Sequence, residues 1–199
     1  MIAIIDYGAG NLQSVKNALD YLKVKSIITS NANEIIKAKK VIFPGVGSFG
    51  DGIRALNELD LIDPIMKAIE DNKPFLGICL GMQVLFEKSE ESPGVEGLGI
   101  FEGTVKKFKG DLKIPQIGWN QLKIQKESML LEGVEDKSFF YFVHSYHADP
   151  EDKEIVLATT DYGREFVSAI EKDNIFALQF HPERSGEIGL KILENFCKL

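Results

Sequence analysis

One of the two cysteines in this 199-residue chain, Cys79, stands two residues after Gly77 and two residues before Gly81. A G-x-C-x-G pattern after an apolar run resembles the nucleophile elbow, a strained turn that lifts a nucleophile out of the edge of a sheet. The small glycines relieve crowding in such a turn. A helix starting there would favour a thiolate through its dipole. The backbone N–H of Leu80 would then be the natural donor to a developing oxyanion.

The alternative for Cys79 is a small buried hydrophobic residue, because cysteine is among the most buried residue types. The flanking glycines favour the nucleophile. Cys197 lies in the amphipathic segment GEIGLKILENFCKL and is predicted to be structural.

A thiol nucleophile requires a base, and the sequence offers His144, His147 and His181. His181 follows the apolar run NIFALQF, and the proline after it favours an extended backbone. Glu183 is close enough in sequence to orient its imidazole, which would complete a Cys–His–Glu triad. His144 also follows an apolar run, so the residues alone leave it open as the base. A metal site made of all three histidines is disfavoured, because His144 and His147 would point to opposite faces of one strand.

The loop PGVGSFGDG, residues 44–52, is rich in glycine. It could be a simple flexible connection, or a phosphate-binding loop, although no G-K-[ST] follows. The functional interpretation is a backbone that can turn an N–H toward a tetrahedral intermediate, since glycine adopts conformations closed to other residues.

The composition is that of a single domain over residues 1–199, with 44% apolar and 27% charged residues and a net charge of −7. Lys106, Lys107 and Lys109 form the main basic cluster, which we interpret as a solvated strand face, and no nucleic-acid surface is expected. Two cysteines suit a reducing compartment. The first residues turn polar at Asp6, and no apolar run approaches the roughly 18 residues of a membrane span. We therefore expect a cytoplasmic protein without a membrane segment.

The apolar spacing predicts alternating strands and helices up to about residue 98. Strands are predicted in MIAIID, KSIITS, KVIFP and KPFLGI, and helices over 11–23, near 51–59 and 62–71, and in NEIIKAK and GMQVLFEK. Asn11 is the predicted N-cap of the first helix. The alternation indicates an α/β fold with a doubly wound, mostly parallel sheet. The later segments are mostly strand-like, which predicts antiparallel additions in the C-terminal half.

These motifs resemble the class I, or triad, glutamine amidotransferases, which hydrolyse glutamine to glutamate and ammonia on a cysteine. GICLGMQ and HPE carry this resemblance. The ordered set DYGAGN, FPGVGSFG, GICLGMQVLFE, PQIGWN, YFVHSY and FHPERSG spans residues 6–186 and resembles one branch of the family. That branch supplies ammonia to a synthase of histidine biosynthesis, and IGWN with FVHSY separates it from the anthranilate and carbamoyl-phosphate branches.

The resemblance implies roles for the matched residues. Cys79 would be the nucleophile, His181 the base and Glu183 its orienting partner. The N–H of Leu80 and a flipped peptide at Val46–Gly47 would form the oxyanion hole. The isolated subunit would be a poor glutaminase that its partner activates, and Gly47 offers a route because its peptide can adopt two orientations.

Further matched positions concern the substrate. Gln83 and Glu91 match residues that hold the amide and α-amino ends of glutamine, although without the resemblance both would be ordinary exposed polar residues. Ser145 and Tyr146 match positions whose backbone holds the glutamine carboxylate. No cofactor and no metal are implied.

The resemblance also implies a partner, a (β/α)₈-barrel cyclase or synthase subunit in a 1:1 heterodimer, through which ammonia passes to a second active site. A tunnel is needed because ammonia released into neutral water becomes ammonium and loses its lone pair. Asn11, Trp119, Tyr141 and Arg184 match positions at or near the interface. Trp119 could instead belong to the core. Arg184 stands where a lysine is common, and its guanidinium does not reproduce the geometry of an ammonium.

Two other functions stay open at the level of sequence. One is a paralogous glutaminase that feeds a different acceptor, such as a nucleotide-sugar amidotransferase. The other is a non-catalytic or thiol-hydrolase module on the same fold.

Overall fold

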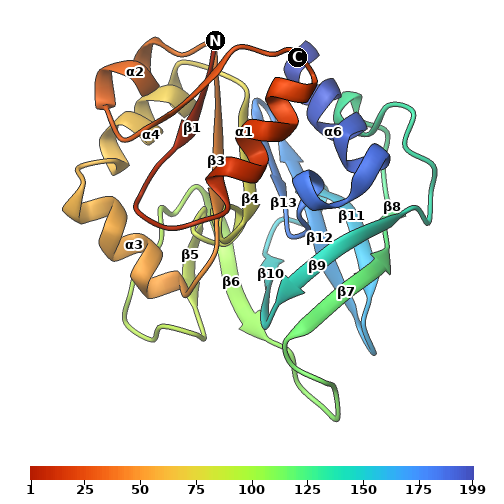
Figure 1. Ribbon diagram of the computed structural model, residues 1–199. Coiled ribbons are helices and arrows are strands. Elements are labelled where there is room, and N and C mark those ends of the chain that lie inside the picture. Colours follow the sequence, from red (N-terminus) through yellow and green to blue (C-terminus); the bar gives the residue numbers. More distant parts are fainter.

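The computed structural model describes residues 1–199, and a mixed eight-stranded sheet runs through its centre (Figure 1). Its strands, from one edge to the other, are β2 (Ser26–Thr29), β1 (Ile2–Ile5), β3 (Lys40–Gly45), β4 (Phe75–Cys79), β13 (Ile175–Leu178), β12 (Glu165–Lys172), β11 (Val156–Asp161) and β8 (Lys123–Ile124). The first five strands pair in parallel, and the last three pair antiparallel. The predicted α/β class, with antiparallel additions toward the C-terminal half, is confirmed.

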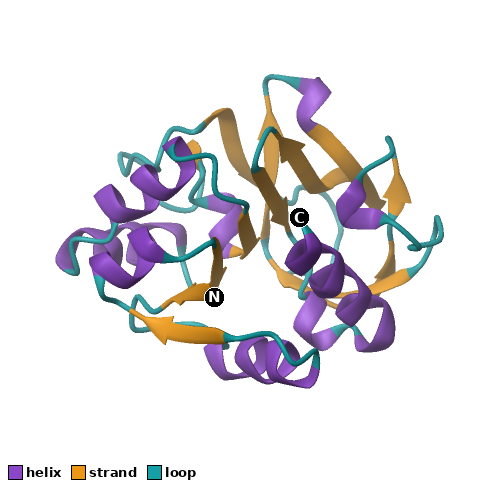
Figure 2. Ribbon diagram, turned by 90° about the horizontal axis from the view of Figure 1, so that it is seen from above, coloured by secondary structure: helices purple, strands orange, loops and turns teal.

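Helices cover both faces of this sheet, as Figures 1 and 2 show. One face carries α1 (Leu12–Tyr21) and α6 (Gly186–Lys198), and the other carries α2 (Ala32–Lys37), α3 (Phe49–Glu58) and α4 (Ile62–Glu70). Alternation along β1 explains the arrangement: Ile4 packs in the cluster with α1 and α6, and Ile5 packs in the opposite cluster. A parallel strand is buried on both faces, so its sequence is apolar throughout.

Smaller elements lie below one end of the large sheet (Figure 1). A three-stranded sheet contains β10 (Tyr146–Pro150), β6 (Phe101–Lys107) and β5 (Phe86–Ser89), and an antiparallel ribbon contains β7 (Gln116–Gln121) and β9 (Phe139–His144). The short helices are α5 (Leu80–Gln83), η1 (Met129–Leu131), η2 (Lys153–Ile155) and η3 (Pro182–Arg184). None of the helices is both long and apolar enough to cross a bilayer.

The predicted helix in GMQVLFEK is wrong beyond its first turn. Helix α5 ends at Gln83, and β5 begins at Phe86. Val84, Leu85 and Phe86 are consecutive and fully buried. An amphipathic helix has a polar side that these three residues cannot supply. Phe86 instead pairs with Phe101 of β6, and the Val84 and Leu85 carbonyls accept from the N–H groups of Leu98 and Ile100.

Asn11 occupies the N-cap position of α1 as predicted, but its side chain does not cap the helix backbone. Its Oδ1 instead accepts a hydrogen bond from the hydroxyl of Ser14 at 2.7 Å. The helix itself runs over 12–21, shorter than the predicted 11–23.

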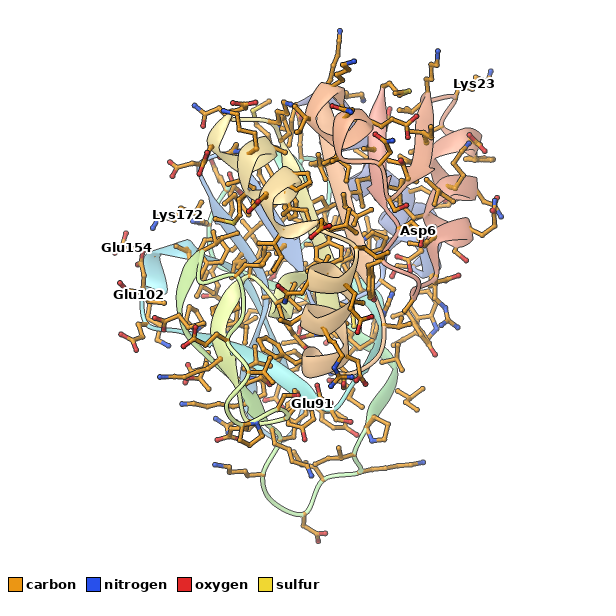
Figure 3. The ribbon with its side chains drawn as sticks, turned by 90° about the vertical axis from the view of Figure 1, so that its left-hand side faces the viewer. Asp6, Lys23, Glu91, Glu102, Glu154 and Lys172 are labelled. Carbon is orange, nitrogen blue, oxygen red and sulfur yellow. The ribbon has the colours of Figure 1, made fainter.

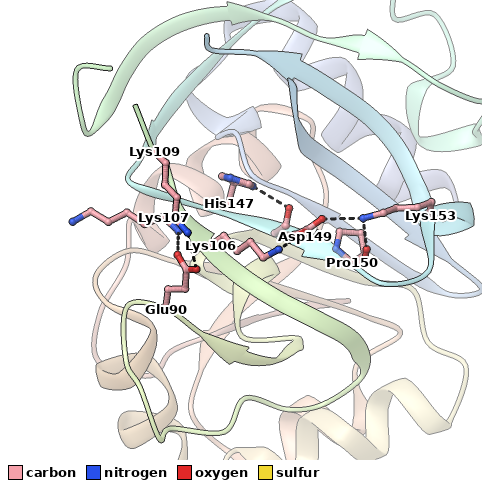
Figure 4. Close-up of polar contacts among 9 residues, drawn as sticks. Glu90, Lys106, Lys107, Lys109, His147, Asp149, Pro150 and Lys153 are labelled. Carbon is pink, nitrogen blue, oxygen red and sulfur yellow. Dashed lines mark hydrogen bonds and ion pairs between the residues drawn. The ribbon is translucent and has the colours of Figure 1, made fainter. Parts of the chain in front are cut away.

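Charged side chains point outward from many elements, as Lys23, Glu102, Glu154 and Lys172 do in Figure 3. The basic cluster is matched locally by acids. Lys106 Nζ lies 2.5 Å from an Asp149 carboxylate oxygen, and Lys109 Nζ lies 3.4 Å from Glu90 (Figure 4).

Asp149 also forms an ion pair with Lys153, whose Nζ lies 2.9 Å from Oδ1 of Asp149. Burial raises the pKa of Asp149, but the hydrogen bonds and charges of Lys106 and Lys153 outweigh burial and lower that pKa to about 2. The lysines therefore belong to a solvated face of mixed charge.

The tightest backbone contact of the fold lies beneath Cys79 and provides a test of the elbow. A Cβ added to Gly81 would lie 1.8 Å from the carbonyl oxygen of Phe43, so Gly81→Ala must displace β3 or α5. We expect a loss of about 3 kcal/mol or more in the free energy of unfolding, measured by urea denaturation. The control is Gly94→Ala, which has φ +84° but open space around it and should lose about 1–2 kcal/mol. Equal losses would contradict the packing argument.

Candidate active site

Cys79 ends β4 and adopts φ +55° and ψ −107°, a conformation that non-glycine residues rarely take. The glycines on either side make this turn possible. A Cβ on Gly77 would lie 2.5 Å from the Gly81 carbonyl oxygen, and Gly81 itself abuts β3. Leu80 is the first residue of α5, so its N–H has no partner within the helix. Because α5 is only four residues long, the helix dipole contributes less here than the sequence suggested.

His181 follows β13, the neighbour of β4 in the sheet, and backbone bonds fix its place. Its N–H donates to the Tyr141 carbonyl at 2.9 Å. The Ser185 hydroxyl donates to the His181 carbonyl at 2.6 Å and accepts from the Tyr141 N–H at 3.0 Å. Strand β9 and helix η3 thus hold this histidine from two sides.

The His181 ring contacts Glu183, with Nδ1 lying 2.9 Å from Oε1, and both side chains are almost fully buried. Burial alone would lower the pKa of His181. Attraction from Cys79 and Glu183 outweighs burial and raises this pKa to about 10. His181 Nε2 is buried and makes no hydrogen bond. Because Nδ1 is held by Glu183, Nε2 is the nitrogen available for proton transfer.

His144 differs from His181 in its partners. Its Nδ1 lies 2.7 Å from the Tyr146 carbonyl and its Nε2 lies 3.1 Å from the side-chain amide of Gln116. Burial lowers the pKa of His144 to about 3. The Gln116 atom that faces Nε2 is Oε1, and a neutral ring that donates from Nδ1 needs that side-chain amide turned so that its nitrogen meets Nε2. This histidine is neutral and structural.

The expectation that His144 and His147 point to opposite faces is wrong. Strand β9 ends at His144, and the chain turns at Ser145 before β10 begins. Both imidazoles therefore pack against the rings of Phe108 and Phe166, with ring-centroid distances of 4.9–5.8 Å.

Gln179 is a site residue that the sequence analysis missed. It is fully buried, and its Nε2 lies 3.7 Å from the Cys79 sulfur. Its Oε1 accepts from Gln83 Nε2 at 3.0 Å, and that same nitrogen donates to the Tyr146 carbonyl at 3.0 Å. A polar residue at the end of the apolar run NIFALQF, two positions before His181, was the available signal.

A cavity of about 240 Å³ opens beside Cys79. The candidate residues that line it are Val46, Gly47, Cys79, Leu80, Gln83, Glu91, Ser145 and Tyr146, and it is completed by Pro115, Val143 and His144. Its size suits a small ligand such as an amino acid, below the usual range for drug-sized molecules. His181 and Glu183 do not line this cavity.

Glu91 has a role in the loop that the sequence did not indicate. Its Oε2 accepts a hydrogen bond from the Phe49 N–H at 2.7 Å, at the first turn of α3, where Figure 3 shows its side chain. Next to it, the Ser92 hydroxyl accepts from the Gly50 N–H at 2.9 Å. One carboxylate oxygen of Glu91 is thus used to cap α3, which leaves the other for a cationic ligand.

The candidate interface residues lie on the outer face of the β7–β9 ribbon and beside it. Trp119 is 55% exposed, so the alternative that places it in the core is wrong. Its ring meets Tyr141 edge-on, and the Arg184 guanidinium lies 4.4 Å from the centre of the Tyr141 ring. Ile117 and Phe139 extend this exposed apolar face.

Asn11 lies apart from that face, at the start of α1. Helix α1 contacts η3, and Ser14, which bonds Asn11, lines a surface cavity together with Glu183. The structure thus brings Asn11 near the other side of η3.

Solved structures share this fold over nearly the whole chain. A structure described as a glutamine amidotransferase aligns with a TM-score of 0.77 at 19% identity, covering 100% of both chains. PurLQS from Thermotoga maritima aligns with a TM-score of 0.76 at 21% identity, covering 99% of this chain and 97% of that one. At these identities the likeness concerns the fold alone.

Curated relatives are closer in sequence. Three are named imidazole glycerol phosphate synthase subunit HisH. The relative from Methanocaldococcus jannaschii is 55% identical over 100% of both chains. The one from Pyrococcus furiosus is 55% identical over 100% of this chain and 98% of its own, and the one from Aquifex aeolicus is 53% identical over 97% and 94%. The family description "Glutamine amidotransferase class-I" matches residues 3–199. This chain therefore belongs to the class I glutamine amidotransferase family.

Proposed function

We propose that this chain, as one glutaminase domain over residues 1–199, is the glutamine-hydrolysing subunit of an imidazole glycerol phosphate synthase in histidine biosynthesis. Relatives with that name at 53–55% identity over nearly the full length support the assignment. The observation that carries the chemistry is the strained elbow at Cys79, which places this residue in the wall of the cavity beside Leu80, the first residue of α5.

In the proposed reaction the Cys79 sulfur attacks the side-chain amide carbon of glutamine. The carbonyl oxygen becomes an oxyanion, which accepts from the Leu80 N–H and from the loop at Val46–Gly47. His181 gives the proton on Nε2 to the amide nitrogen, the carbon–nitrogen bond breaks, and ammonia leaves. Water then attacks the thioester while His181 takes its proton, and glutamate is released with the thiolate restored.

The raised pKa of His181 suits this sequence, because the proton for ammonia is already on the ring when substrate binds. Glu183 holds Nδ1 and so directs Nε2 toward the reacting atoms. The side-chain N–H₂ group of Gln179 donates to the Cys79 sulfur and would stabilise negative charge on it.

Glutamine is held by the groups around the cavity. We assign its α-ammonium to the free oxygen of Glu91 and its carboxylate to the backbone of Ser145 and Tyr146. Both Gln83 N–H groups are committed to Tyr146 and Gln179, so the Oε1 of Gln83 is the atom available to the substrate amide. No metal or other cofactor takes part in this chemistry.

The proposed partner is a (β/α)₈-barrel synthase subunit in a 1:1 cytoplasmic heterodimer, with neither nucleic acid nor membrane involved. Trp119, Tyr141 and Arg184 supply an exposed aromatic and cationic surface of the kind that carries binding energy in protein interfaces. Asn11 flanks it. Ammonia would leave the site through the barrel and reach the second reaction before it is protonated.

Replacing the nucleophile separates the two half-reactions. Cys79→Ala should abolish glutamine-dependent synthesis by the complex, while synthesis from added ammonium salts at raised pH persists, because the barrel subunit is unchanged. The measurement is product formation from each nitrogen source. Persistent glutamine turnover in the variant would remove the proposal. A wild-type chain that hydrolyses glutamine, but neither binds nor is activated by a barrel synthase, would instead indicate a different ammonia acceptor.

The two histidines near the cavity should respond differently to substitution. His181→Asn should lower glutaminase turnover by about 10²–10⁴-fold, the usual contribution of a general acid–base group. His144→Asn serves as the matched comparison. It should lower the melting temperature, because it disturbs a buried, hydrogen-bonded ring, and should cost far less turnover per folded molecule than His181→Asn. Similar losses of turnover would mean that His181 has been given the wrong role.

The exposed aromatic face should govern partner affinity. Trp119→Ala should weaken binding to the barrel subunit by about tenfold or more, measured by isothermal titration calorimetry. Tryptophans that become buried when a protein interface forms are frequent hot spots. Leu59→Ala is the control, because Leu59 is also an exposed apolar residue but follows α3 on the opposite side of the sheet. Unchanged affinity in Trp119→Ala would place the partner elsewhere.

A further inference from the structure

The hydroxyl of Tyr7 contacts both polar backbone groups of Val46. It accepts a hydrogen bond from the Val46 N–H at 3.0 Å and donates one to the Val46 carbonyl at 3.1 Å. Val46 belongs to the loop that the glutaminase chemistry uses for the oxyanion, and 39 residues separate it from Tyr7. Nothing in the reaction described above uses this contact.

One hydroxyl therefore restrains two successive peptide planes. The Val46 N–H belongs to the peptide that joins Gly45 to Val46, and the Val46 carbonyl belongs to the peptide that joins Val46 to Gly47. Each peptide is planar, so turning either plane carries its N–H or its carbonyl away from Tyr7. Any reorientation of this loop breaks at least one of the two hydrogen bonds.

The same contact opposes rotation of the peptide assigned to the oxyanion hole. Val46 lines the cavity beside Cys79, but Tyr7 does not. The Val46 carbonyl, which accepts from the Tyr7 hydroxyl, belongs to the Val46–Gly47 peptide, so that peptide cannot turn without losing this hydrogen bond. Of the groups at this end of the cavity, the Leu80 N–H at the start of α5 remains free of such a restraint.

The Tyr7 side chain is itself held firmly. It is 3% exposed, and its ring packs edge-on against Phe43 with centroids 5.4 Å apart. Its hydroxyl also lies 2.9 Å from the point that a Cβ on Gly45 would occupy. Burial raises the pKa of Tyr7 to about 12, against the lowering effect of the Val46 bond, so the hydroxyl keeps its proton at any working pH.

Gly47, in contrast, leaves the loop free to turn. It has φ +106°, and a Cβ built on it would meet nothing within 4 Å. The loop thus combines a permissive residue on one side of Val46 with a single hydroxyl that opposes rotation.

We propose that Tyr7 is a positioning residue that holds the Val46 peptides in a resting orientation, and that loss of its two hydrogen bonds releases the loop to complete the oxyanion hole. The inference rests on the proposed glutaminase function. It assigns to one side chain part of the difference in glutaminase turnover between the isolated subunit and the complex.

Tyr7→Phe tests this directly, because it removes the hydroxyl and keeps the ring that packs on Phe43. The glutaminase turnover of the isolated subunit should rise about fivefold or more, the effect of one net hydrogen bond. The Michaelis constant for glutamine should stay the same, because the donor acts on the transition state. Turnover in the complex should change less than twofold, so the activation ratio should fall.

Tyr162→Phe is the matched control. The Tyr162 hydroxyl also donates to a backbone carbonyl, that of Lys113 at 2.7 Å, but outside this loop, and its loss should leave the activation ratio unchanged. A Tyr7→Phe variant with an unchanged ratio, or with turnover lowered equally with and without the partner, would overturn the inference. Absence of glutaminase activity in the wild-type complex would instead show that the proposed function has failed.

Discussion

The close approach of backbone beneath Cys79 is the constraint on which the rest of the site depends. The carbonyl of Phe43 in β3 lies where a Cβ on Gly81 would be, and Gly45 is pressed against Leu80 in the same way. Strands β3, β4 and β13 are neighbours, and each ends in a segment of the site: the Val46 loop, Cys79 and His181. Because parallel strands present their carboxyl ends at one edge, three distant parts of the chain meet around one sulfur.

Two buried histidines near that sulfur show how the groups facing an imidazole ring set its pKa. His181 faces a buried carboxylate and the cysteine, and its pKa rises to about 10 despite burial. His144 faces a carbonyl and an amide, which do not compensate for burial, and its pKa falls to about 3. The difference arises from the negative groups at His181, because both rings are almost fully removed from water.

Tyr141 connects the exposed aromatic face to the base. Its ring lies under the Arg184 guanidinium and beside Trp119, while its backbone exchanges hydrogen bonds with His181 and Ser185. The exposed aromatic face and the segment that positions the imidazole therefore share one residue. The buried Tyr7 hydroxyl contacts both backbone polar groups of Val46, in the loop that follows β3 and lines the same cavity as Cys79.

The sequence by itself determined the α/β class and the nucleophile pattern, because alternating apolar runs and the glycines around Cys79 are local signals. The Cys79 elbow, the glycine-rich loop and HPE could all be found by reading along the chain. The prediction of a helix in GMQVLFEK was wrong because a non-local contact decides the structure there. The single helical turn gives way to β5, which pairs with β6.

Only the tertiary structure distinguished the two histidines, since His144 and His181 both follow apolar runs and differ in what packs against them: a backbone carbonyl at His144 and the Glu183 carboxylate at His181. The same holds for Gln179 beside the sulfur and for Tyr7 beneath Val46. These contacts join residues far apart in the chain, and the neighbour that gives each side chain its role exists only once the sheet has assembled.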